Sequence, residues 1–397
     1  MPLLIALSVA AFASSIQMRA LDPMVPIVAG DLGVDLSRGA LLVSAYSFPY
    51  AAMQIVLGPA ADALGKVRLI IVSLGGVMIG SLASAFAPGY DSLIVARAVA
   101  GAFAGGIIPI AWALIGDRIA LGERQVAISR VMVVSIVAQM IGAAGAGLFA
   151  VTIGWRWAFS VAAAVAVLSL VIVATVLSDI ELAMHRPTLR AAFASYRTVF
   201  GSPMALLVFG AVAGEGILFF GLFPFVAPLL AEHGGGGTAQ AGIAIAGFGA
   251  GGVGYGLLAR QIIRGLGPWR MMAWGGALAG AMYLIMAWPL AWTLVALLFV
   301  MAGFGFYMVH NTLQVQGSEL APRARGAAFA LFASFFFMGQ GAGPIVGAAV
   351  ARHFGYTALF AGAGVLVVLL AAVAAAAMRR VSRRGLAVAP ARWPAPD

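Results

Sequence analysis

The chain has 397 residues, of which 63% are apolar and only 9% are charged, and its formal net charge at pH 7 is +10. A water-soluble chain of this length could not cover its surface with so few charges, so the composition predicts an integral membrane protein. The sequence has no cysteine, which excludes disulfides, thiolate metal sites and thiol catalysis.

Apolar runs long enough to cross a hydrocarbon layer of roughly 30 Å recur along the whole chain. The first run has no basic region before it and continues past the length of a signal-peptide core, so we interpret it as a membrane helix. We predict one helical bundle with twelve membrane helices, at 3–26, 40–60, 68–88, 91–114, 126–150, 157–177, 203–231, 239–260, 269–288, 291–312, 326–350 and 355–377.

The positive charges are unevenly distributed between the two predicted sides of this bundle. With both termini in the cytoplasm, the inner loops and tail hold 18 Lys and Arg residues, whereas the outer loops hold only Arg38, Arg156 and Arg352. This asymmetry follows the positive-inside rule and predicts cytoplasmic termini. We therefore interpret the net charge as a topology signal and a contact with anionic lipid, not as a nucleic-acid-binding surface.

The predicted helices fall into two sets of six. Residues 179–200 form the most polar extended segment and separate the two sets. At an offset of 201 residues, matches in three separate regions indicate an internal repeat: Pro23 and Pro224, Gln139 and Gln340, Gly142 and Gly343, Gly154 and Gly355. We predict an N-terminal half over 1–178, a cytoplasmic linker over 179–200, a C-terminal half over 201–378 and a basic tail over 379–397.

A polar turn between the second and third predicted helices carries the most specific motif. It reads Gly58-Pro-Ala-Ala-Asp62-Ala-Leu-Gly65-Lys66-Val-Arg68. Gly65 permits a tight turn, Lys66 and Arg68 hold it in the cytoplasm, and Asp62 can cap a helix or pair with a cation. The spacing G-x-x-x-D-x-x-G-[KR]-x-[KR] closely resembles the signature loop of major facilitator transporters, which implies that the turn belongs to a cytoplasmic gate.

Further motifs extend this resemblance over the whole chain. Arg97, Gly101 and Gly105 on the fourth predicted helix resemble the family's R-x-x-x-G-x-x-x-G pattern, and glycines four residues apart make a flat face for helix contact. The Asp22-Pro23 end of the first helix is similar to that of the twelve-helix drug:proton antiporter branch. The fifth helix departs from that branch, because its glycine-rich segment lacks the expected proline, and the better match is Gly343-Pro344 on the eleventh.

The resemblance implies an all-α fold of two pseudo-symmetric six-helix halves, with the substrate bound between them near the bilayer midplane. It implies proton-coupled export of a small organic molecule or drug by a monomer. Arginine outnumbers lysine 22 to 1, which fits a GC-rich bacterial coding sequence, and we expect a protein of the bacterial inner membrane. The alternatives are uptake of an organic anion or sugar by symport or facilitated diffusion, and a non-transporting membrane scaffold or sensor. No Walker loop, His-Glu-x-x-His pair or catalytic triad is present, so we expect no enzyme, cofactor or metal.

Ionisable groups inside the bilayer are costly and therefore are candidates for function. Glu215 lies 12 residues past Pro203, roughly 18 Å along its helix, so we expect it near mid-membrane as the proton-coupling group. A structural pair with an arginine or hydroxyl is the alternative. Asp22 is the second candidate; it can meet Arg19 one turn away, in a structural pair or in a site. The resemblance suggests that Arg97 modulates a nearby acid, and a helix-packing arginine is the alternative.

Substrate contacts are predicted from polar and aromatic residues within the apolar runs. Two glutamines at matched depth either line a cavity or join helices. A histidine late in the tenth helix, near the cytoplasmic face, either titrates in the site or is solvated there. The aromatic residues suit an apolar pocket or ordinary packing. The predicted substrate-binding residues are Arg19, Gln139, Gln340, Tyr46, Tyr50, Phe219, His310 and Asn311.

Overall fold

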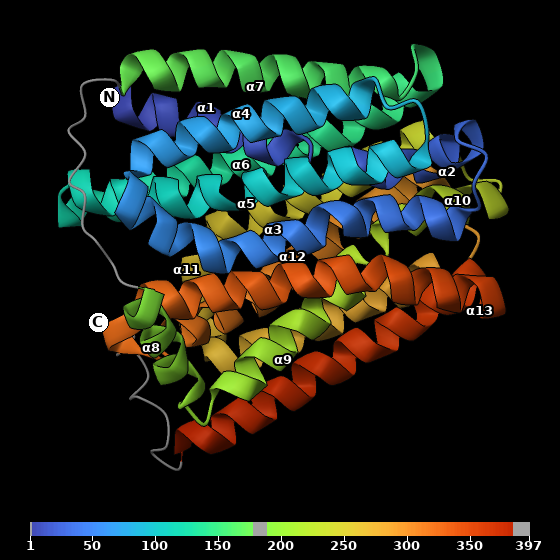
Figure 1. Cartoon of the computed structure of the whole chain (residues 1–397). Helices are drawn as coiled ribbons and strands as arrows, with labels where there is room; N and C mark the ends of the chain where they lie inside the picture. Colours follow the sequence, from blue (N-terminus) through green and yellow to red (C-terminus); the bar gives the residue numbers. More distant parts are fainter. Residues whose placement is uncertain (1, 178–188, 384–397) are drawn as a thin grey trace.

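The computed structural model describes residues 2–177 and 189–383, and every regular element in these two segments is helical (Figure 1). The N-terminal segment holds α1 (Pro2–Ile16), α2 (Leu21–Asp31), α3 (Leu36–Leu64), α4 (Lys66–Ala85), α5 (Tyr90–Arg118), α6 (Leu121–Thr152) and α7 (Arg156–Val176). The C-terminal segment holds α8 (Leu189–Phe200), α9 (Ala205–Glu215), the π-helix η1 (Gly216–Phe220), the 3-10 helix η2 (Phe223–Phe225), α10 (Val226–Glu232), α11 (Thr238–Met286), α12 (Trp292–Ser318), the 3-10 helix η3 (Pro322–Ala324) and α13 (Arg325–Arg383).

The helices are long and apolar enough to cross a membrane. Among the described residues nine segments meet this condition, and α1 and α2, bent by 42°, form a tenth. Two of the segments, α11 and α13, have 49 and 59 residues and each contains a glycine with non-helical backbone, Gly267 and Gly355. About 20 residues suffice to span the hydrocarbon core, so each of these is long enough for two spans. The architecture is thus consistent with the twelve predicted spans.

The first and seventh predicted spans are broken near their middle. The chain leaves α1 after Ile16, turns through residues 17–20 and resumes as α2. In the seventh span α9 gives way to η1 and then η2, where Pro224 cannot donate a backbone hydrogen bond. Such breaks free backbone groups and redirect side chains, and in a membrane they are tolerated where they are covered by protein or line a cavity.

The internal repeat appears as the same helix contact in both halves. A Cβ added to Gly142 would strike the carbonyl of Ile16, and one added to Gly343 would lie 2.8 Å from the carbonyl oxygen of Ile217. The two glycines are 201 residues apart in the sequence, and so are the two isoleucines. Gly154 and Gly355 match as well, with φ of 103° and 83° in equivalent turns. Only glycine adopts such angles without strain, so the repeated glycines reflect repeated geometry.

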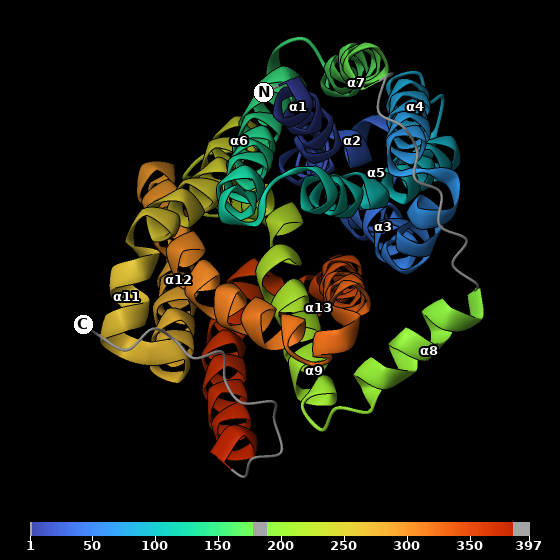
Figure 2. The same ribbon diagram turned by 90° about the vertical axis from the view of Figure 1, so that its left-hand side faces the viewer.

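The two halves are separate bundles that lie side by side (Figure 2). Two apolar clusters are built from buried residues of the N-terminal half, and two others are built almost entirely from buried residues of the C-terminal half, with Ala40 and Ala143 of the N-terminal half joining one of them. The halves meet mainly where α3 packs on α13 and α6 packs on α11. Large apolar side chains are exposed around the outside, for example Leu206 at 80% and Leu257 at 78%, as a surface covered by lipid requires.

Both ends of the described chain lie at one end of the bundle, together with α8 (Figure 1). We call this end the terminal face and the other end the opposite face. The predicted linker is partly helical, since α8 covers Leu189–Phe200, and α13 continues to Arg383, five residues into the predicted tail. Residues 179–188 of the linker and 384–397 of the tail lie outside the described residues, and the limits of the halves stay a prediction.

A hydrogen bond ties α8 to the N-terminal half. The hydroxyl of Tyr196 donates to the backbone carbonyl of Ile55 over 2.7 Å. In a helix that carbonyl would accept from residue 59, which is a proline without an N–H. The phenol is protonated at neutral pH and can donate, and partial burial raises the pKa of Tyr196 further. The proline therefore creates the acceptor that Tyr196 uses.

Candidate functional site

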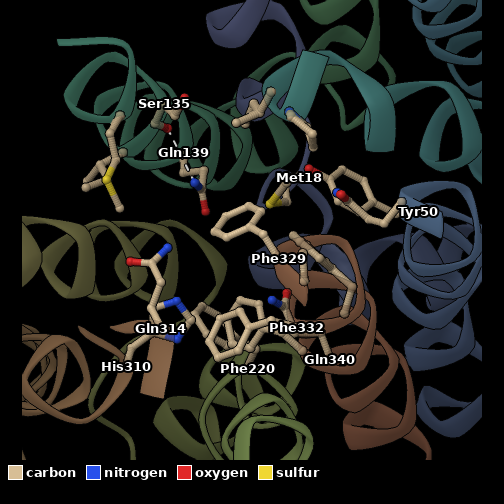
Figure 3. Close-up of a pocket in the computed structure, with 18 of the residues that line it drawn as sticks. Met18, Tyr50, Ser135, Gln139, Phe220, His310, Gln314, Phe329, Phe332 and Gln340 are labelled. Carbon is tan, nitrogen blue, oxygen red and sulfur yellow. Dashed lines mark hydrogen bonds between the residues drawn. The ribbon is translucent and has the colours of Figure 1, made fainter. Parts of the chain in front are cut away.

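A cavity of about 160 Å³ lies between the two halves (Figure 3). Its walls come from the break between α1 and α2 and from α3, α5 and α6 on one side, and from η1, α12 and α13 on the other. Arg19 and Gln340 lie at its inner end. Trp112, Gln314 and Phe329 line it close to the helix ends at the terminal face, so the cavity extends toward that face.

Between the cavity and the opposite face the halves are in direct contact. Ser44 of α3 donates its hydroxyl to the carbonyl of Gly341 in α13 over 2.7 Å. Closer to the opposite face, a Cβ added to Gly147 of α6 would lie only 3.2 Å from the Cα of Gly242 in α11. Small residues let these backbones approach closely. The cavity is therefore closed toward the opposite face by contacts between the halves.

Arg19 occupies the inner end of the cavity and joins the two halves. Because it lies in the turn between α1 and α2, its guanidinium reaches across to Gln340 on α13, donating from Nη2 to Oε1. Its Nη1 is 3.4 Å from Asp22 Oδ2, and its Cζ lies 4.2 Å from the centroid of the Phe220 ring. Asp22 is fully buried in the first turn of α2, where the helix dipole favours a carboxylate.

Glu215 is fully buried one side chain away from the cavity. Its Oε2 pairs with Nδ1 of His310 over 2.8 Å, and its Oε1 has no hydrogen-bond partner among the described residues. The acid ends α9 at the junction with the π-helix η1, and π-helical turns frequently occur at functional sites. His310 lines the cavity whereas Glu215 does not. The histidine therefore separates the carboxyl group from the cavity.

Arg97 is almost completely buried behind Tyr46. Its Cζ lies 4.4 Å from the centroid of the Tyr46 ring and 5.4 Å from that of Phe159. Within the described part of the chain it forms no ion pair, and its Nε and Nη1 have no hydrogen-bond partner. It is close enough to Asp22 to interact with it electrostatically. Arg97 does not line the cavity.

The structure brings together some of the predicted substrate-binding residues and not others. Those that line the cavity are Arg19, Tyr50, Gln139, His310 and Gln340; those that do not are Tyr46, Phe219 and Asn311. Phe219 packs in the core against Phe306 and Tyr283, and its neighbour Phe220 faces the cavity instead. Adjacent helical residues point in different directions, so the composition of a run does not show which aromatic faces inward.

The alternative that His310 is a solvated histidine is wrong, since its side chain is only 12% exposed. The imidazole is enclosed by Phe306 and Phe336, with ring centroids at 5.1 and 4.8 Å, and it pairs with Glu215. The sequence reasoning also missed part of the lining, namely Gln54, Phe306, Tyr307, Gln314, Phe336 and Phe337. Gln54 and Gln314 could have been found in the same way as Gln139, because each is a neutral amide inside an apolar run.

The signature turn is only partly described. Gly65 joins α3 and α4 with a φ of 91°, as the predicted tight turn requires. Lys66 pairs with Asp117 at the end of α5, and Arg68 is exposed. The side chain of Asp62 and the surroundings of Gly58 lie outside what the structure describes. Gly101 and Gly105 bring α5 against α3, because a Cβ at either would strike the backbone of Tyr46 or Tyr50. Their gating role stays a prediction.

Two pseudo-symmetric helical halves with a cavity between them define the chain as a membrane protein of the alternating-access transporter class. The family model of the Major Facilitator Superfamily matches residues 7–325, and the chain belongs to this superfamily. Its family and its structural neighbours are transporters, not enzymes.

Three relatives illustrate the similarity in sequence. The multidrug export protein EmrB of Haemophilus influenzae is 29% identical over 157 residues, which are 40% of this chain and 31% of EmrB. The puromycin resistance protein pur8 of Streptomyces alboniger is 34% identical over 146 residues, 36% of this chain and 29% of pur8. The chain thus spans about a third of the length of both. An uncharacterized transporter, YceJ of Bacillus subtilis, is 25% identical over 84% of this chain and 86% of its own.

The fold is also found in solved structures. A peptide transporter, POT, in complex with sulfate superimposes with a TM-score of 0.78, and the match covers 97% of this chain and 95% of that one. The two sequences are only 16% identical. This similarity shows the shared fold and does not extend to the substrate.

Proposed function

We propose that the protein is a secondary active transporter that exports a small organic molecule or drug in exchange for protons. The observation that carries the proposal is the Glu215–His310 pair, a buried carboxyl group held 2.8 Å from an imidazole that lines the cavity. Ionisable groups inside a membrane span are energetically costly and usually mark a substrate pathway or a proton relay. The names of EmrB and pur8, a multidrug export protein and a puromycin resistance protein, support the export direction.

In this proposal the two halves rock about the cavity. The contacts that close the opposite face, such as Ser44 with Gly341, would separate while the halves approach each other at the terminal face. The level of Arg19 and Gln340 lies between these two regions, and the halves would pivot there. The signature turn with Asp62 would form part of the gate at the terminal face, which is cytoplasmic by the positive-inside rule.

Glu215 is the proposed proton-coupling group, and His310 passes the proton between cavity water and the carboxyl group. An imidazole with one nitrogen on the carboxylate and the other free can accept a proton on one side and release one on the other. Asp22 is the second candidate, and Arg97 is close enough to interact with it electrostatically. The substrate would lie against Tyr50, Gln139 and Gln340 in a monomer of the inner membrane.

One observation favours a second candidate function, the uptake of an organic anion with protons. Arg19 is a cation at the inner end of the cavity, where it could hold a carboxylate. Export and uptake differ in the sign of the pH gradient that drives accumulation. A transport experiment with both gradient directions therefore separates them.

The test is transport in reconstituted vesicles with an imposed pH gradient. Puromycin, benzoate and glucose serve as probes, and a trapped pH-sensitive dye reports proton movement. We expect a proton flux with at least one probe and its loss in Glu215→Gln, which keeps the size of the side chain. The control is Glu232→Gln, an exposed acid at the end of α10 in the same span. Transport that ignores the pH gradient, or that survives Glu215→Gln unchanged, would refute proton coupling at this residue.

A further inference from the structure

The basic groups near the cavity line it, whereas the acidic groups do not. Among the described lining residues the ionisable groups that can be cationic, Arg19 and His310, face the cavity, and no carboxylate does. The two nearby acids, Asp22 and Glu215, have no exposed surface and lie behind these two bases. A molecule in the cavity would therefore meet cationic and neutral groups first.

The buried charges beside Arg19 do not balance. Arg19 and Arg97 both interact with Asp22, and Arg97 has no other carboxylate partner within the described residues. Two guanidinium groups thus share one carboxylate in a region of low dielectric. An uncompensated buried charge is unfavourable, so a bound anion would stabilise this cluster and a bound cation would destabilise it.

Gln340 marks the place where an anionic oxygen would lie. Its Oε1 accepts a hydrogen bond from Nη2 of Arg19, and the Nε of Arg19 has no partner among the described residues. A guanidinium presents its donors in a planar fork that matches a carboxylate. A substrate carboxylate that replaces the amide oxygen of Gln340 would form a stronger, charge-assisted pair with Arg19.

The walls around this position are aromatic. The Cζ of Arg19 lies 4.2 Å from the centroid of the Phe220 ring. The ring centroids of Tyr50 and Phe337 are 4.0 Å apart, and those of Trp112 and Phe329 are 5.1 Å apart. Trp112 lines the cavity, and its indole N–H is a buried donor without a partner in the described chain. A cavity of roughly 150 Å³ holds benzene, and this one measures about 160 Å³. It therefore has room for one aromatic ring in the conformation observed.

We propose that the cavity binds small aromatic carboxylates, with the carboxylate on Arg19 and the ring between the aromatic walls, and that it rejects organic cations of the same size. The inference rests on the proposed function in one respect, that the substrate occupies this cavity. It names the substrate class and is independent of the direction of transport and of proton coupling.

Three probes of one shape test the charge preference without any gradient. Benzoate, benzamide and benzylammonium differ in charge but share the ring, and each is measured by equilibrium dialysis against the full chain in detergent, with empty micelles as background. A hydrogen bond to a charged group is stronger than a neutral one, so we expect benzoate to bind about tenfold more tightly than benzamide. Benzylammonium should not exceed the background. Cyclohexanecarboxylate should bind more weakly than benzoate because its ring is not aromatic.

Two variants and a control assign the preference to Arg19. Arg19→Gln should lower the affinity for benzoate to that for benzamide. Arg19→Gln combined with Asp22→Asn should do the same without leaving Asp22 unpaired, which keeps the test valid if the single variant does not fold. Arg38→Gln is the matched control, because Arg38 also lies over an aromatic ring, with its Cζ 4.4 Å from the centroid of the Tyr90 ring, but is exposed and does not line the cavity.

The outcomes distinguish this inference from the proposed function. Benzylammonium binding as tightly as benzoate, or benzoate binding that Arg19→Gln leaves unchanged, would overturn the inference. Equal binding of cyclohexanecarboxylate and benzoate would overturn the aromatic part of it. Glu215→Gln should keep the preference for benzoate, since the variant alters proton coupling and not Arg19. A loss of proton-driven transport with an intact binding preference would therefore refute only the coupling scheme.

Discussion

Removal of His310 should destabilise the protein chiefly because it leaves Glu215 buried and unpaired. The carboxyl group has no exposed surface, and Nδ1 of His310 at 2.8 Å is its one hydrogen-bond partner among the described residues. Removing one partner of a buried pair costs about 3–5 kcal/mol. We therefore expect His310→Phe, which keeps a ring between Phe306 and Phe336, to lower the free energy of unfolding by about 3–5 kcal/mol.

The same reasoning predicts rescue when the acid is removed as well. Replacing both members of a buried pair by apolar groups of similar shape is often neutral. The double variant His310→Phe with Glu215→Met should thus be more stable than His310→Phe alone. Unfolding in mixed micelles of a neutral and a denaturing detergent measures all members of this cycle.

A matched control separates the pair from a general effect of losing a histidine. His353 is exposed, and His353→Phe should change the free energy of unfolding by no more than about 0.5 kcal/mol. Strictly additive effects of His310→Phe and Glu215→Met would refute the reasoning, because they would mean that the two side chains do not interact in the folded protein.

Three further predictions concern the backbone, each measured by the same unfolding assay. Tyr196→Phe leaves the Ile55 carbonyl without its donor and should lower the free energy of unfolding by about 1–3 kcal/mol. The loss should be smaller when residue 59 is also changed from proline to alanine, because the helix can then supply an N–H to that carbonyl. Gly142→Ala strikes the carbonyl of Ile16 and should cost about 1–3 kcal/mol, while Gly145→Ala meets nothing within 4 Å and should be neutral or stabilising. Gly355→Ala forces an alanine to a φ of 83° and should cost about 1–3 kcal/mol, although it has open space around it; an unchanged stability would show that the turn relaxes.

Much of the fold could be predicted from the sequence because lipid imposes a simple rule. A span must be apolar and long enough, so the runs in the sequence mark the helices with small errors at their ends. The repeat at an offset of 201 predicted equivalent positions, and Gly142 and Gly343 do make equivalent contacts. The breaks in the first and seventh spans could not be predicted in this way, since an apolar run looks the same whether its helix is continuous or interrupted.

The candidate site was predicted by residue type and not by arrangement. Polar groups inside apolar runs are conspicuous, so Arg19, Asp22, Glu215 and both pseudo-symmetric glutamines could be identified as candidates from the sequence. The residues with which they form hydrogen bonds could not be predicted. Nothing in the spacing indicates that Arg19 meets Gln340, 321 residues away, or that His310 meets Glu215, 95 residues away.

The sequence by itself therefore determined that lipid surrounds the protein, where the apolar spans run, that the chain contains an internal repeat, and to which family it belongs. These properties depend on composition and on short-range patterns, which act on each segment separately. Only the tertiary structure decided that Phe220 and not Phe219 faces the cavity. It also decided that Arg19 and His310 separate the two buried acids from the cavity, and that the two halves are in contact at the opposite face. Those features depend on the rotation and tilt of each helix against its neighbours, and this is set by packing between residues that are far apart in the chain.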